Sequence, residues 1–253
     1  MRSYVLFVNS LFLATIAALL ASFETTRLDV IGFVFASTFL AYSFIRASEV
    51  LPQQKKIWWM LNTASSVAAV ILTLAFSKDQ WILISFNALV VLAYRGIGNF
   101  SLRKKIYLKP FSIAICWTIN TSLIPFDQNP FFLPNDHSAG PQAINILVLT
   151  YCLSLLYDLK DVARERSSLL TLASISGIKK VFHLNETLLI ILTGFGIYAY
   201  YYLSHGIAIF AAMLYVLIIQ FLWNRWKEPR TTFLIDGAYI IYIIAFILCK
   251  NLV

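Results

Sequence analysis

The most informative part of the chain is a stretch of charged and small residues, YDLKDVARERSSLLTLASISG, which runs from Tyr157 to Gly177. Within it, Asp158, Asp161 and Glu165 stand at positions i, i+3 and i+7, so on a helix they share one face. Three carboxylates this close repel one another unless a cation lies between them, and oxygen ligands of this kind suit Mg²⁺. The spacing leaves a second interpretation open, a solvated helix end in which the interleaved basic residues pair with the acids.

The composition around this stretch is that of a membrane protein. Of the 253 residues, 60% are hydrophobic and only 13% are charged, whereas about a quarter of the residues in a soluble protein are charged. A soluble chain of this length has too little interior to bury so much apolar surface. We therefore predict an integral membrane protein. The formal net charge of +8 does not indicate nucleic-acid binding, because the basic residues lie in loops between apolar segments.

Nine apolar segments are long enough to be read as membrane spans. A helix crosses the hydrocarbon core in roughly 20 residues and satisfies its own backbone groups there. The sequence thus predicts an all-α bundle of nine transmembrane helices. The segments are Tyr4–Ser22, Val30–Ile45, Trp58–Phe76, Trp81–Tyr94, Phe111–Phe126, Ile144–Tyr157, Leu184–Leu203, Ile207–Trp223 and Phe233–Leu248.

The distribution of basic residues predicts the orientation of these spans. Lys and Arg accumulate in cytoplasmic loops. If the N-terminus is cytoplasmic, all of the 20 Lys and Arg residues except Arg27, Lys78 and Lys250 fall on the cytoplasmic side. We therefore expect one nine-helix domain over residues 1–253, with the N-terminus in the cytoplasm and the C-terminus outside.

The acidic stretch resembles the second aspartate motif, DxxDxxxD, of the UbiA superfamily of intramembrane prenyltransferases. Asp158 and Asp161 match the motif, Glu165 replaces its third aspartate, and Thr171-Leu172 resembles a Thr-Leu pair that follows the motif in the family. The family fold has nine transmembrane helices and carries this motif at the cytoplasmic end of the sixth, where the span count also places it. The resemblance implies that Asp158, Asp161 and Glu165 hold Mg²⁺.

The loop before the fifth span resembles a second segment of the same family. Phe100-Ser101-Leu102-Arg103-Lys104-Lys105, followed by Pro110, is similar to the family's YPxxKR…P segment. The resemblance implies that Lys104 and Lys105 bind the diphosphate of a prenyl donor.

The first aspartate motif of the family is missing. It belongs at the cytoplasmic end of the second span, where this chain has AYSFIRASEV, residues 41–50. Arg46 stands about where an aspartate is expected, and Glu49 is the only acid nearby. A guanidinium group matches phosphate oxygens with paired donors, so Arg46 is a candidate diphosphate ligand, and Glu49 is a candidate pocket residue.

A few polar residues lie inside the predicted spans. Interhelical hydrogen bonding explains most such residues, although Asn62 and Asn120 are candidates for lining a pocket. Asp236 lies near the start of the ninth span, where a helix N-terminus favours an acid. We expect Asp236 to have that capping role.

The resemblance implies a prenyltransferase that uses Mg²⁺ and a prenyl diphosphate, with an aromatic or lipid acceptor that the sequence does not identify. No residue is assigned as a catalytic nucleophile, because ionisation of the donor requires none. The alternative is a UbiA-fold protein that has lost the chemistry and serves as a binding or assembly subunit. The expected surroundings are the lipid bilayer of a bacterial inner (plasma) membrane, with a protein partner in the second case and no nucleic acid in either.

Overall fold

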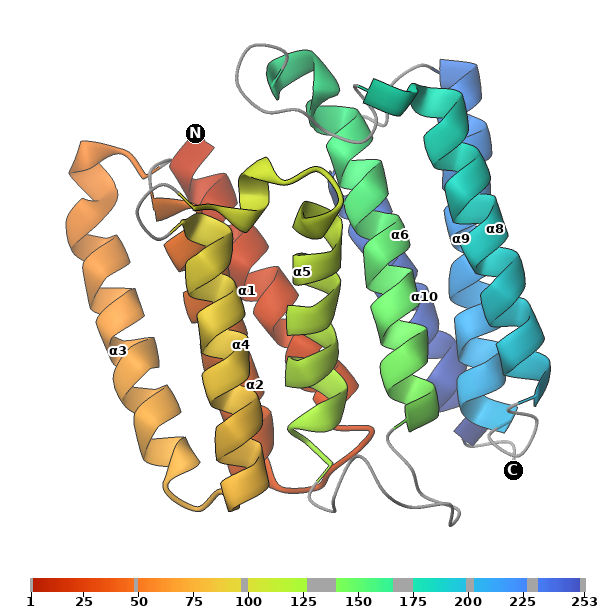
Figure 1. Ribbon diagram of the computed structural model, residues 1–253. Coiled ribbons are helices and arrows are strands. Elements are labelled where there is room, and N and C mark those ends of the chain that lie inside the picture. The colour runs from red at the N-terminus through yellow and green to blue at the C-terminus, as the bar shows by residue number, and fades with distance from the viewer. Residues whose placement is uncertain are drawn as a thin grey trace. The chain divides into compact units, whose positions relative to one another are not determined.

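Nine α-helices of 11 residues or more occur in the part of the chain that the structure describes. The structure is a computed structural model, which describes residues 2–47, 50–96, 100–126, 140–165, 175–198, 203–226 and 232–250 (Figure 1). The helices are α1 (Arg2–Ala21), α2 (Leu28–Ile45), α3 (Lys55–Thr73), α4 (Lys78–Arg95), α5 (Leu108–Thr118), α6 (Gly140–Glu165), α8 (Ile178–Tyr198), α9 (Leu203–Trp226) and α10 (Thr232–Lys250).

Each helix falls on one of the nine apolar segments predicted from the sequence. The apolar windows of α2 and α6, Leu28–Ile45 and Gln142–Leu159, are long and hydrophobic enough by themselves to cross a bilayer, with mean hydropathies of 1.8 and 1.4. Most boundaries differ by a few residues from the predicted ones; α8, for example, begins at Ile178 and not at Leu184. Two further differences affect the local structure. α6 continues past its apolar part through all three predicted metal ligands to Glu165, and α5 passes at Ile119 into a short π-helix, η4 (Ile119–Leu123).

The chain forms two compact units. The first contains Met1–Phe100 and Cys116–Ala143, and the second contains Ser101–Ile115 and Ile144–Val253. In the first unit, α1 packs on α2, α2 packs on α3, and η4 contacts α1, α2 and α4. Ala14, Ala17 and Ala21 of α1 are completely buried. Small residues let helix backbones approach closely, as is common where helices associate in membranes.

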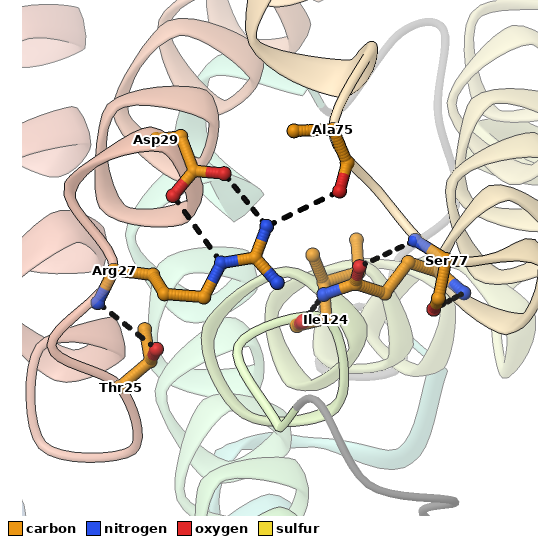
Figure 2. A network of polar contacts seen from close by, with 7 residues as sticks. Thr25, Arg27, Asp29, Ala75, Ser77 and Ile124 are labelled. Atoms are coloured by element: carbon orange, nitrogen blue, oxygen red, sulfur yellow. Dashed lines mark hydrogen bonds and ion pairs between the residues drawn. The ribbon is translucent and has the colours of Figure 1, made fainter.

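Polar contacts join three connections of the first unit at one end (Figure 2). The guanidinium of Arg27, just before α2, pairs with Asp29 at 2.7 Å and donates to the carbonyl of Ala75 at 3.3 Å. The side chain of Gln80 donates to the carbonyl of Ile124 at 2.8 Å. Gln80 also forms a capping box with Ser77 at the start of α4. Arg27, one of the three basic residues predicted outside the cytoplasm, thus links the loop before α2 to the loop before α4.

Glu24 gives the first unit a dependence of stability on pH. The side chain lies in the turn between α1 and α2, and burial raises its pKa from 4.5 to about 7. Because the folded-state pKa is the higher one, the stabilising contribution is complete below about pH 4.5 and is lost as the pH rises through about 7.

We therefore expect the melting temperature of the wild-type protein in detergent to fall between pH 5 and pH 8 more steeply than that of a Glu24→Gln variant. Thermal unfolding of both proteins in the same buffers measures the difference. Equal slopes in the two proteins would contradict the assignment to Glu24.

The second unit is organised around α6. Leu153, Leu155 and Leu156 are fully or almost fully buried, and they lie on different sides of the helix. α6 also forms polar contacts with two other helices of the unit. The Tyr239 hydroxyl of α10 donates to the Thr150 hydroxyl at 2.7 Å, and the Asn185 side chain of α8 donates to the Cys152 carbonyl at 3.5 Å. This packing fixes the helix that carries the acidic motif.

Candidate functional site

A buried ion pair lies at the start of the acidic motif. The Lys109 ammonium of α5 is 2.6 Å from the Oδ1 atom of Asp158 on α6. Lys109 is 7% exposed and Asp158 is 3% exposed. Charges are almost never buried to this degree unless they are paired. The pair therefore joins the first turn of α5 to the end of the apolar part of α6.

Asp236 accepts a hydrogen bond from the residue before Asp158. The hydroxyl of Tyr157 donates to Oδ1 of Asp236 at 2.5 Å, and Asp236 is buried. The prediction that Asp236 serves as an N-terminal cap is wrong. It is the fifth residue of α10, so it lies beyond the first turn and faces α6 instead.

The two lysines predicted to bind a diphosphate are solvent-accessible. Lys104 ends the short 3₁₀-helix η3 (Leu102–Lys104), and Lys105 follows it. Both side chains are exposed, unlike Lys109 four residues further on. Exposed ammonium groups are accessible to an anionic ligand from solution.

Arg46 lies in the first unit at the C-terminal end of α2, where the backbone leaves helical geometry. It is half-buried and lines a small pocket together with Phe7, Ser10, Ser43, Val50 and Trp58. The pocket is lined mostly by apolar surface, and Arg46, Ser10 and Ser43 are among its residues. Glu49, the acid predicted to lie near Arg46, is outside the described residues.

Asn120 and Asn62, the two candidate pocket residues, both form hydrogen bonds within the first unit. The Asn120 side chain donates to the Thr38 hydroxyl at 2.7 Å and accepts from Ser37 at 3.1 Å, so it connects η4 to α2. The Asn62 side chain donates at 2.8 Å to the Trp58 carbonyl of its own helix. These contacts favour structural roles for both residues.

The predicted metal site is described only at Asp158. The side chains of Asp161 and Glu165 are outside the described residues, although the backbone of α6 includes both. Among the described side chains, no group of three His, Cys, Asp or Glu residues could hold a metal ion. Oδ1 of Asp158 is in contact with an ammonium group, which does not fit direct coordination of Mg²⁺ by that atom.

Lys109 is the residue of the site that the sequence reasoning missed. The sequence predicts Lys109 only as one of the basic residues between two apolar segments, since its position shows a positive charge but not its burial. The one signal in the sequence is its place directly before Pro110 and the apolar segment that begins at Phe111.

Comparison with known proteins identifies the fold. No protein-family model matches the sequence, and no curated protein matches it. Solved structures of a UbiA homolog from Archaeoglobus fulgidus do match. The structure bound to Cd²⁺ has a TM-score of 0.65 at 10% identity, covering 98% of this chain and 99% of that chain. The structure bound to GPP and Mg²⁺ has a TM-score of 0.64 at 10% identity, covering 97% and 99%.

The structure of the same homolog bound to DMAPP and Mg²⁺ has a TM-score of 0.63 at 11% identity. The likeness extends over nearly the full length of both proteins. This chain therefore has the all-α, UbiA-like fold that the acidic motif and the span count predicted.

Proposed function

We propose that this protein binds a prenyl diphosphate and transfers its prenyl group to an aromatic or lipid acceptor. The observation that carries the proposal is the UbiA-like fold over nearly the whole chain, shared with structures that hold DMAPP or GPP together with Mg²⁺. The chain also keeps an acid, Asp158, at the expected place on α6 and two accessible lysines, Lys104 and Lys105, before α5.

The chemistry proposed here requires charge neutralisation and no protein nucleophile. The allylic C–O bond breaks as the diphosphate leaves, the acceptor attacks the resulting cation, and the acceptor then loses a proton to water or to the released diphosphate. Lys104 and Lys105 would neutralise the developing charge of the diphosphate. The resemblance implies Mg²⁺ as the cofactor. We assign it to the predicted ligands Asp161 and Glu165, because Asp158 is already paired with Lys109.

We further propose that the protein spans a bacterial inner membrane several times, as a single domain with its N-terminus in the cytoplasm. The nine helices on the predicted apolar segments support this proposal. The basic residues support it as well, because all but Arg27, Lys78 and Lys250 lie on one side of the predicted spans. The prenyl donor would then bind from the cytoplasm.

Binding of geranyl diphosphate to the purified protein tests the proposed function. We expect binding in Mg²⁺-containing buffer, and a loss of affinity of about tenfold or more in a Lys104→Gln/Lys105→Gln variant, since each exposed contact to a charged group is worth about 1 kcal/mol. Equilibrium binding of radiolabelled geranyl diphosphate in detergent measures the affinity of the wild type and of the variant.

A Lys55→Gln/Lys56→Gln variant is the matched control. It removes another exposed pair of adjacent lysines, at the start of α3, on the same predicted side of the membrane. Its affinity should equal that of the wild type. Equal losses in the two variants would show only a general effect of charge. No binding at millimolar donor would rule out the proposed function.

The second candidate is a UbiA-fold protein without transferase activity that acts as a binding or assembly subunit. Two observations favour it. The first is that Arg46 stands where the first acidic motif is expected. The second is that Lys109 forms an ion pair with Asp158, a predicted metal ligand. Release of diphosphate from bound donor in the presence of candidate acceptors separates the two functions, because a binding subunit would retain the donor intact.

A further inference from the structure

The Lys109–Asp158 pair occupies the place where a metal ligand was predicted. Both side chains come from helices of the second unit, and both are more than nine-tenths buried. An ammonium and a carboxylate held 2.6 Å apart in such surroundings neutralise each other and are weakly screened by solvent.

A divalent cation on the same oxygen would be incompatible with this arrangement. Mg²⁺ binds carboxylate oxygens at about 2.1 Å and needs near-octahedral space around it. The Lys109 nitrogen already lies 2.6 Å from Oδ1. A metal coordinated there would stand against an ammonium group, and like charges at that distance repel strongly in a buried site.

We infer that Lys109 takes the place of a divalent cation at Asp158. The carboxylate is then neutralised by the ammonium group of Lys109 and not by a metal. The inference goes beyond the proposed function and does not depend on it, because the pair needs no bound diphosphate for this role.

Metal affinity and stability of four full-length proteins test the inference: the wild type, Asp158→Asn, Lys109→Met and the double variant. Mn²⁺ serves as the probe for a divalent site, followed by its electron paramagnetic resonance signal. We expect Asp158→Asn to leave the Mn²⁺ affinity of the wild type unchanged. We expect Lys109→Met to bind Mn²⁺ about tenfold more tightly than the wild type, because it releases a carboxylate.

Thermal unfolding of the same proteins provides an independent measurement. Lys109→Met leaves a buried carboxylate without its lysine, so its melting temperature should fall by about 10 °C. The double variant removes both charges and should recover at least half of that loss. It also provides a folded reference if the single variant is recovered poorly.

Two results would overturn the inference. One is a loss of Mn²⁺ affinity of about tenfold or more in Asp158→Asn, which would make Asp158 a metal ligand. The other is a melting temperature of the double variant that falls by the sum of the losses in the two single variants. That result would show that the two side chains do not act as a pair. Neither measurement uses a prenyl ligand. A protein that fails to bind geranyl diphosphate but shows the coupled melting temperatures would therefore refute the proposed function and leave this inference standing.

Discussion

Replacing Arg46 by glutamine should weaken the binding of geranyl diphosphate by about a hundredfold. A hydrogen-bonded contact between a half-buried guanidinium and a phosphate is worth up to about 3 kcal/mol, and 2.7 kcal/mol corresponds to a factor of a hundred. Arg46 lines its pocket with Ser43, Ser10 and the apolar side chains of Phe7, Val50 and Trp58. The half-buried position of Arg46 limits the screening of its charge by water. Calorimetric or radioligand titration of the two proteins measures the change.

Arg95→Gln is the matched control for this prediction. Arg95 is the last residue of α4, and its guanidinium lies 4.1 Å from the centre of the Phe44 ring of α2, two residues before Arg46 in the sequence. The substitution removes the same charge from an exposed side chain that does not line the pocket. We expect a change in affinity of less than about threefold, since exposed charges are screened. Equal losses for Arg46 and Arg95 would contradict a specific role for Arg46.

The fold could be predicted from the sequence because its physical causes are local. Apolar segments of the length needed to cross a membrane must satisfy their backbone hydrogen bonds internally, so helix is the expected state of each one. In the ranges that the structure describes, nine helices overlap the nine predicted segments. The extension of α6 to Glu165 was less visible, because the hydropathy falls sharply after Tyr157 while the helix continues.

The π-helical turn after α5 could not be predicted in this way. In η4 the amide of Ile124 bonds the carbonyl of Ile119, five residues earlier, at 2.9 Å. Hydropathy reports whether a residue is apolar and carries no information on the register of backbone hydrogen bonds. The register depends on packing against α1, α2 and α4, which are distant in sequence.

The candidate site could be predicted only as far as residue type. The sequence located an acid at Asp158 and lysines before α5, because carboxylates and ammonium groups are conspicuous in an apolar chain. It did not reveal which lysine is buried, since that depends on how α5 packs against α6. The same limit applies to Asp236, whose position near a helix start suggested a cap while its partner is Tyr157 of another helix.

Replacing Asn120 by leucine should lower the free energy of unfolding by about 2 kcal/mol. The buried Asn120 side chain bonds two hydroxyl groups of α2, on Thr38 and Ser37, and its amide also lies 3.4 Å from the Val34 carbonyl. Interhelical hydrogen bonds in membrane proteins are worth about 0.6 kcal/mol each on average, and a buried group left without its partner adds to the cost. Leucine has a similar volume, so the loss reports the polar contacts rather than a cavity.

Asn62→Leu separates this effect from the general cost of replacing a buried asparagine. Asn62 is also buried, but its amide bonds only the carbonyl of Trp58, one turn earlier in α3, among the contacts described for it. That carbonyl keeps its helical environment in the variant, so we expect a change below about 0.5 kcal/mol. Thermal or denaturant unfolding in the same detergent compares the free energies of unfolding of the Asn120→Leu and Asn62→Leu variants. If Asn62→Leu were as damaging as Asn120→Leu, the connection between η4 and α2 would not be what makes Asn120 important.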